Sequence, residues 1–142
     1  MLARKKGRPV RRGTSLVEAA VVYPVTILIL LGSIVLGLGV YRYSEIQALS
    51  REGARYASVH GPQYAADSGQ AYATNSTVLS YIETLAVGLQ NDNLTCTVTW
   101  SPSPPTTSTP STVSVQLTYS WVPEGYFQTA TFTSTSVMPV TY

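Results

Sequence analysis

The chain has 142 residues, enough for one small domain, and only 11% of them are charged, against about 25% in ordinary soluble domains. This low charge excludes a highly charged disordered protein. A single cysteine, Cys96, and a single histidine, His60, exclude an intrachain disulfide framework and a metal site built from several cysteines or histidines.

Positive charge is concentrated near the first residue, where six of the nine basic residues lie within the first twelve positions. The rest of the chain holds three basic and seven acidic residues. A basic cluster can indicate nucleic-acid binding, but an apolar segment follows this one directly. That order favours membrane targeting with the basic end held in the cytoplasm, so we expect no nucleic-acid partner.

An uncharged run of 22 residues, Ala19–Val40, comes next. As a helix it would be about 33 Å long, enough to cross the ~30 Å core of a bilayer. The remaining chain is too short to surround a core helix that is apolar on all sides. A secretory signal peptide has a shorter apolar region and a small-residue cleavage site, whereas Tyr41-Arg42-Tyr43 follows here. We therefore predict a retained, single-pass transmembrane helix over residues 14–41.

Three residues inside the run bear on helix packing. Pro24 should bend the helix or loosen its first turns, because proline lacks a backbone donor. Ser33 and Gly37 form a small-xxx-small pair, which lets two helices approach closely. Glycine is also common in membrane helices without any such role, and the sequence leaves both explanations open.

The junction before the run contains Gly13, four further residues, and then a lone acidic residue, Glu18. A carboxylate at the edge of an apolar run needs a reason, because membrane insertion of charge is costly. One explanation is a helix cap, since Ser15 and Glu18 have the spacing of a capping box. In that arrangement Glu18 would also face the positive end of the helix dipole.

A second explanation is processing, and it is compatible with the first. A basic leader, a glycine, four residues, a glutamate and a long apolar helix resemble the start of prepilins, which a membrane-bound prepilin peptidase cuts after the glycine. The resemblance implies cleavage between Gly13 and Thr14, with loss of a leader of residues 1–13. Glu18 would then be a counter-ion for the new amino group of Thr14, in its own or a neighbouring chain, and would set the register of assembly.

Helical spacing continues beyond the run, in a stripe formed by Ile46, Leu49, Gly53 and Ala57. Arg42 and Glu45, and also Glu52 and Arg55, are opposite charges three residues apart. We expect one helix from about Ser15 to about Val59, ended by His60-Gly61-Pro62. Its part after the membrane, 42–59, would be a helical stalk within an extracytoplasmic head of residues 42–142.

The head should contain one further helix. Residues 63–73 look like a loop or a frayed helix start, and apolar residues between 78 and 89 then repeat with helical spacing. Asn75 or Ser76 could cap this helix, and residues 91–93 would end it.

The remaining sequence alternates apolar and polar residues, which is typical of half-buried strands. We predict strands over 94–100 and 113–121, and a third, less regular and perhaps bulged strand over about 129–140. The Pro/Ser/Thr-rich segment 101–111 between the first two should be an exposed loop. The predicted fold is therefore α+β: a long N-terminal transmembrane and stalk helix, a second helix, and a small antiparallel three-stranded sheet packed on the helices.

Few residues of the head could carry chemistry. Cys96 lies on the apolar face of its strand and is interpreted as a small buried residue, while His60 lies in a turn without a titratable partner. Glycosylation sequons occur at Asn75 and Asn93, but these are also predicted cap and turn residues. The sequence has no phosphate-binding loop, metal cluster or nucleophile–base set, so we expect neither enzymatic activity nor a cofactor nor a small-molecule substrate.

Two segments, RRGTSLVEAAVVYP before the long helix's apolar part and SREGARYAS after it, resemble the TadE-like minor pilin (pseudopilin) family of tight-adherence, or Flp-type, pili. The matching positions are Arg11, Arg12, Gly13, Val17, Glu18, Ala19 and Pro24, followed by Arg51, Glu52, Gly53, Ala54, Arg55 and Ala57. Ala19 departs from the aromatic residue that often follows the glutamate. The clear resemblance covers about residues 11–60, with a weaker echo in the last strand.

The resemblance implies a minor pilin of the bacterial inner membrane that is processed by a prepilin peptidase. Its other partners would be pilins or pilus-assembly proteins, and its role would be the initiation or assembly of a thin pilus. The alternative is an uncleaved, signal-anchored envelope protein with a partner-binding head and no pilus role.

Overall fold

The computed structural model describes residues 12–107, 111–123 and 128–141, with side-chain surroundings given from Ser15 onward. Most of the predicted leader, 1–13, and the side chains at the predicted cleavage site lie outside the described residues. The chain divides into two compact units, Met1–Leu38 and Gly39–Tyr142.

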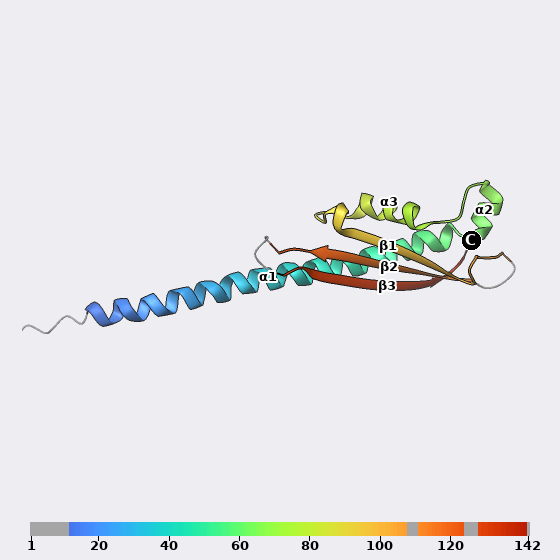
Figure 1. The fold of residues 1–142 in the computed structure, drawn as a ribbon. Coiled ribbons are helices and arrows are strands. Elements are labelled where there is room, and N and C mark those ends of the chain that lie inside the picture. The colour runs from blue at the N-terminus through green and yellow to red at the C-terminus, as the bar shows by residue number, and fades with distance from the viewer. Residues whose placement is uncertain (1–11, 108–110, 124–127, 142) are drawn as a thin grey trace, which may run out of the picture. The chain divides into compact units, whose positions relative to one another are not determined.

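The long helix predicted from the sequence is confirmed as α1, Arg12–Val59, a single helix of 48 residues that continues through Pro24 (Figure 1). It begins three residues before the expected start at Ser15. Ser15 and Glu18 therefore lie inside the helix, and the capping box predicted for them is wrong.

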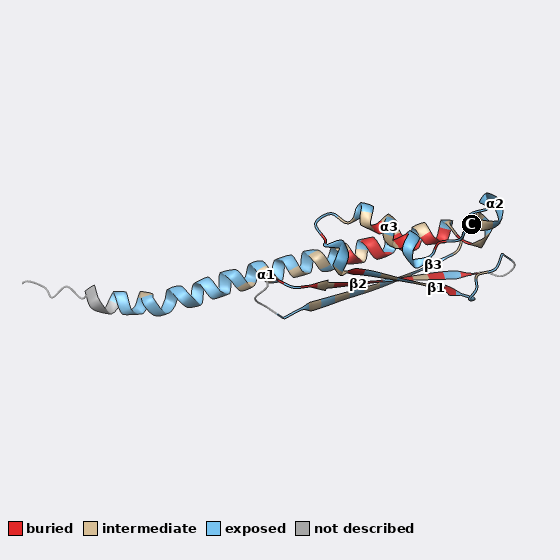
Figure 2. Cartoon of the chain, turned by 45° about the horizontal axis from the view of Figure 1, so that its top comes forward, coloured by how far each residue is buried: buried red, intermediate tan, exposed pale blue. Residues whose placement is uncertain are grey.

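The first part of α1 is apolar and exposed. The stretch Ser15–Val59 contains a segment long and apolar enough to cross a membrane, and none of that segment is buried. Figure 2 shows the same exposure along the helix. A core helix would have its apolar side chains covered by protein, so the exposure excludes that role. Length, composition and exposure fit a single-pass membrane anchor.

A short helix, α2, Pro62–Ser68, occupies the segment expected to be a loop or frayed helix start. Pro62 stands in its first turn, where a missing N–H costs nothing. Gly69 ends α2 in the left-handed conformation, with φ of 70°, which glycine adopts without a steric penalty. The proline that was expected only to end α1 therefore also begins α2.

The second predicted helix is α3, Asn75–Leu85. Its N-cap is Thr74, whose hydroxyl accepts from the Thr77 backbone N–H at 3.4 Å while the Thr77 hydroxyl accepts from the Thr74 N–H at 2.8 Å. The predicted caps, Asn75 and Ser76, are thus wrong. Asn75 instead uses its Oδ1 to accept from the Val98 backbone N–H at 2.9 Å, which ties α3 to the edge of β1.

The C-terminal end of α3 comes earlier than predicted. Ala86 leaves the helix with an extended backbone, and Gly88 has a φ of 85°, a conformation that reverses the chain and that other residues rarely adopt. A single 3₁₀ turn, η1, Asn91–Asn93, then leads into the sheet.

The three strands are β1, Leu94–Ser101, β2, Thr112–Trp121, and β3, Ala130–Pro139, arranged antiparallel in the order β1-β2-β3. β3 pairs with β2 residue for residue from Ala130 to Pro139, so the bulge expected in this strand is wrong. Small polar residues on its inner face had hidden the regular alternation. The predicted α+β class and antiparallel three-stranded sheet are confirmed.

The core of the head lies between the inner face of the sheet and the helices. β2 supplies its centre, since Val113, Val115, Leu117 and Tyr119 are almost fully buried. On the helices, Ile46, Ala54, Ala57, Val78 and Ile82 are fully buried. The head packs in this way because β2, as the middle strand, has neighbours on both edges and presents alternate residues to the helices.

Candidate membrane anchor and assembly segment

Glu18 is the single charged residue between Ser15 and Tyr41. Its side chain is exposed, and within the described part of the chain it makes no hydrogen bond or ion pair. Residues four apart on a helix are neighbours on one face, so the backbone of Thr14 lies on the face that Glu18 occupies. Among the residues from Ser15 onward whose side chains are described, none supplies a cation to this carboxylate.

The small residues of the anchor leave open space beside the helix. A Cβ built on Gly32 or Gly37 would meet nothing within 4 Å. Ser33 donates its hydroxyl to the Ile29 carbonyl at 2.8 Å, so it carries no unsatisfied donor into an apolar environment. A second helix could therefore approach closely at Ser33 and Gly37. Pro24 does not interrupt α1 before this surface.

In the segment Arg51–Arg55, α1 packs closely against α3 and β2. A Cβ on Gly53 would lie 2.8 Å from Ile82 Cδ1 and 3.4 Å from Val115 Cγ1, so a side chain at this position would force Ile82 to shift. Ala54 beside it is fully buried, whereas Arg51 and Arg55 are exposed. Glu52 accepts a long hydrogen bond, 3.4 Å, from the Tyr81 hydroxyl.

Residues 13–55 match the family model of TadE-like proteins. This segment is TadE-like. The match contains Gly13, Glu18, the apolar run and the Arg51–Arg55 motif, and it confirms the resemblance found in the sequence. Comparison with curated proteins and with solved structures gives no match.

The TadE-like segment lies entirely on α1 and ends before the first strand. It combines the exposed apolar anchor with the glycine and alanine against which α3 and β2 pack. The family pattern therefore covers the anchor and the helical side of the head's core, while residues 56–142 complete the head beyond it.

Arg42, also in the TadE-like segment, has a role that the sequence did not reveal. Its Nη1 donates to the Gly88 carbonyl at 3.1 Å and to the Tyr119 hydroxyl at 3.2 Å, and its guanidinium lies 5.5 Å from the centroid of the Trp121 ring. It holds the turn after α3 against the sheet. The predicted pairing with Glu45 is absent among the described residues, as is that of Glu52 with Arg55.

Glu45 instead has one carboxylate oxygen, Oε2, buried without a hydrogen-bond partner. Burial raises the pKa of Glu45 above its ordinary value of 4.5, and the Arg42 charge and the Val87 backbone N–H only partly oppose this rise. Because the folded state binds this proton more tightly than the unfolded state does, the head loses stability as the pH rises from 4.5 to the folded pKa of Glu45, and the loss is complete above it.

We therefore expect Glu45→Gln to raise the melting temperature of the full-length protein in detergent at neutral pH. The gain should shrink as the pH falls through the raised pKa of Glu45 toward 4.5, since the carboxyl becomes neutral there. Thermal melts followed by near-UV circular dichroism between these conditions measure it. Asp92→Asn, at an exposed position, is the control, and an equal gain at every pH would contradict the prediction.

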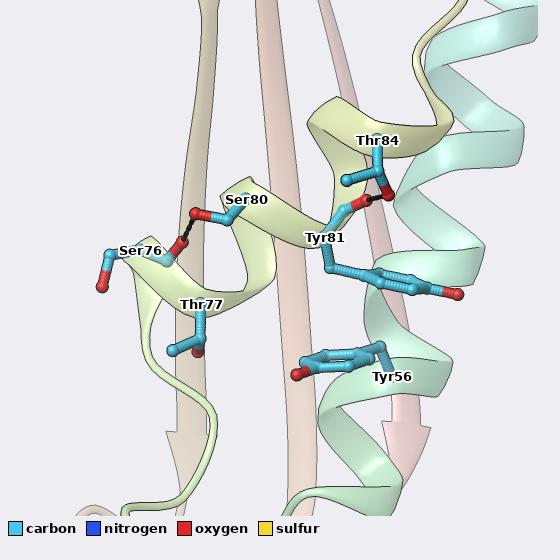
Figure 3. A pocket seen from close by; sticks show the side chains of 6 residues that line it. All are labelled: Tyr56, Ser76, Thr77, Ser80, Tyr81 and Thr84. Carbon is cyan, nitrogen blue, oxygen red and sulfur yellow. Dashed lines mark hydrogen bonds between the residues drawn. The ribbon is translucent and has the colours of Figure 1, made fainter.

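An open pocket of about 470 Å³ lies on the opposite side of α3 from the sheet, and Figure 3 shows its side chains. The Tyr56 and Tyr81 rings stack in it with centroids 4.4 Å apart. The hydroxyls of Thr77, Ser80 and Thr84 donate to carbonyls of their own helix region, at 3.0, 2.9 and 2.6 Å. The lining thus consists of aromatic rings and of hydroxyls that are already hydrogen-bonded to the backbone. It contains no carboxylate or imidazole that could act as a base.

The single histidine, His60, and the single cysteine, Cys96, have packing roles. His60 is half-buried, stacks on Tyr56 with centroids 4.0 Å apart, and places Nδ1 2.9 Å from the Tyr56 carbonyl, so it is more than an ordinary turn residue. Burial raises the pKa of the Cys96 thiol to about 11, and little reactive thiolate forms at neutral pH. Among the described residues, no group of histidine, cysteine and acidic side chains could hold a metal ion.

Proposed function

We propose that this chain is a TadE-like minor pilin that helps to initiate or assemble a tight-adherence type pilus. The observation that carries the proposal is the TadE-like match over residues 13–55, and the exposed apolar segment within Ser15–Val59 supports it. The chain would be anchored in the bacterial inner membrane, with the basic leader in the cytoplasm and the head outside.

The first step would be removal of the leader by a prepilin peptidase, between Gly13 and Thr14. Cleavage separates six positive charges from the anchor. These charges resist movement of the chain out of the membrane, because each would have to cross the bilayer core. Cleavage also creates an ammonium group on Thr14, one helical turn from Glu18.

The second step would be association of the anchor with other pilin helices. Glu18 would pair with the Thr14 ammonium of its own or a neighbouring subunit, since a paired charge in apolar surroundings is far less costly than an unpaired one. The open surface at Ser33 and Gly37 would let the neighbouring helix approach. The head, 42–142, would then lie at the outer end of each anchor and contact other pilus-assembly proteins.

The experiment is N-terminal sequencing of the protein extracted from membranes of cells with and without the peptidase. We expect the mature chain to begin at Thr14 only when the peptidase is present. Gly13→Leu should abolish cleavage, because a bulky residue replaces the glycine at the cut, while Gly7→Leu in the same leader should leave it intact. A chain that keeps Met1 in peptidase-positive cells would contradict the proposal and favour an uncleaved envelope anchor.

A further inference from the structure

One end of the sheet meets α1 where the apolar run of the anchor finishes. Trp121 ends β2, and its ring lies 3.2 Å from the position that a Cβ on Gly39 would take. Phe132, near the start of β3, comes within 3.9 Å of the same position. Gly39 is the first residue of the head unit and the last but one of the apolar run, so its missing side chain admits the indole at this boundary.

The side chains at this end form an aromatic cluster. The Trp121 and Phe132 rings have centroids 6.1 Å apart, and so do those of Tyr43 and Phe132. The outer part of the cluster is open to its surroundings, since Tyr43 is 42% exposed and the neighbouring Val122 is 49% exposed, whereas Trp121 is buried. Tryptophan and tyrosine favour the headgroup level of a bilayer, where an apolar ring and a polar atom are both accommodated.

Arg42 lies beside the cluster. Its guanidinium is 5.5 Å from the centroid of the Trp121 ring, and its Nη1 donates to the Gly88 carbonyl and the Tyr119 hydroxyl. The other end of the sheet also carries an aromatic pair, since the Tyr72 and Trp100 rings have centroids 5.7 Å apart. The cluster around Trp121 is distinguished by its position beside Gly39, at the end of the apolar run.

The length of the anchor would put Gly39, the first residue of the head unit, near the bilayer boundary. Residues 19–38 precede the head unit and would span about 30 Å as a helix, which is the thickness of the hydrocarbon core. We propose that Tyr43, Val122 and Phe132, which lie beside the buried Trp121, form a lipid-contact surface in the headgroup layer of the membrane crossed by the anchor. The surface rests on the membrane anchoring in the proposed function, and it would hold the head against the bilayer before assembly.

The test uses the full chain reconstituted in phosphatidylcholine vesicles that carry nitroxide-labelled lipids. Trp100→Phe leaves Trp121 as the single tryptophan, and Trp121→Phe leaves Trp100. The two are matched, since each is 8% exposed. Trp100 pairs with Val113, eight residues along β2 from Trp121, or about 27 Å away.

Trp121 fluorescence should fall by roughly twofold or more with labels near the headgroup and less with labels near the chain ends, as expected for an interfacial indole. Trp100 fluorescence should not change. A protein that floats with the vesicles but shows no quenching of Trp121 would overturn the lipid-contact surface and leave the anchor intact. A protein that does not float with the vesicles would overturn the anchor, and the surface with it.

A second pair of variants keeps the test independent of the tryptophan substitutions. In a Cys96→Ser background, a spin label is attached at Val122→Cys or at Val137→Cys; both valines are exposed, at 49% and 61%. The label at 122 should be more accessible to oxygen than to a water-soluble nickel chelate, and the label at 137 should show the reverse. Equal preference for the chelate at both positions would overturn the proposal.

Discussion

Replacing Gly53 with valine is expected to destabilise the head by about 1–3 kcal/mol, the usual cost of overpacking a filled core. A side chain at this position would start 2.8 Å from Ile82 Cδ1 and 3.4 Å from Val115 Cγ1. Ile82 and Val115 are both fully buried, so neither can move aside into solvent. The loss should outweigh the small gain in helix propensity from replacing glycine.

A double-mutant cycle tests whether Gly53 and Ile82 share this space. Ile82→Ala removes as many carbon atoms as Gly53→Val adds, and alone it should cost about 2–5 kcal/mol by leaving a cavity. In the double variant valine would occupy that cavity, so the combined loss should be clearly smaller than the sum of the single losses.

Urea unfolding of the full-length protein in detergent, followed by tryptophan fluorescence, measures the four stabilities. Ala48→Val, on an exposed position of the same helix, controls for the effect of a branched side chain on the helix itself. Additive losses, or a Gly53→Val variant as stable as the parent, would contradict the packing of α1 against α3 and β2.

Glu18→Gln is expected to leave leader cleavage intact and to abolish pilus assembly. Glutamine keeps the size of the side chain and one acceptor oxygen, but it replaces the other oxygen with an NH₂ donor and removes the charge that would pair with the Thr14 ammonium. Losing one partner of an ion pair in apolar surroundings costs about 3–5 kcal/mol, and the loss would recur at each contact that this subunit makes through Glu18.

Two measurements on the same cells check this prediction. The N-terminal sequence reports cleavage, and electron microscopy with a sheared-pilus preparation reports assembly. Glu18→Asp is the matched control, since it retains the charge and should retain part of the assembly. Normal piliation of Glu18→Gln would remove Glu18 from the mechanism, whereas loss of cleavage would place Glu18 in recognition by the peptidase.

Short-range patterns in the sequence were sufficient to predict much of the fold. The apolar run, followed by helical spacing, predicted α1 to within three residues at its start, and period-two alternation predicted all three strands to within one or two residues. The boundaries that were missed depend on single backbone conformations. Gly69 and Gly88 adopt positive φ, and the sequence alone does not distinguish such glycines from those inside α1.

The sequence by itself determined the anchor, the alternating strands and the TadE-like segment, because each depends on the order and spacing of residue types along the chain. Only the tertiary structure decided the partners of individual side chains. Arg42 binds Gly88 and Tyr119, far along the chain, in preference to the nearby Glu45. A side chain at Gly53 would be too close to Ile82 and Val115, which also lie far along the chain. Such partners come together only when the helices and the sheet pack. Burial of apolar surface then stabilises contacts between residues that are distant in the sequence.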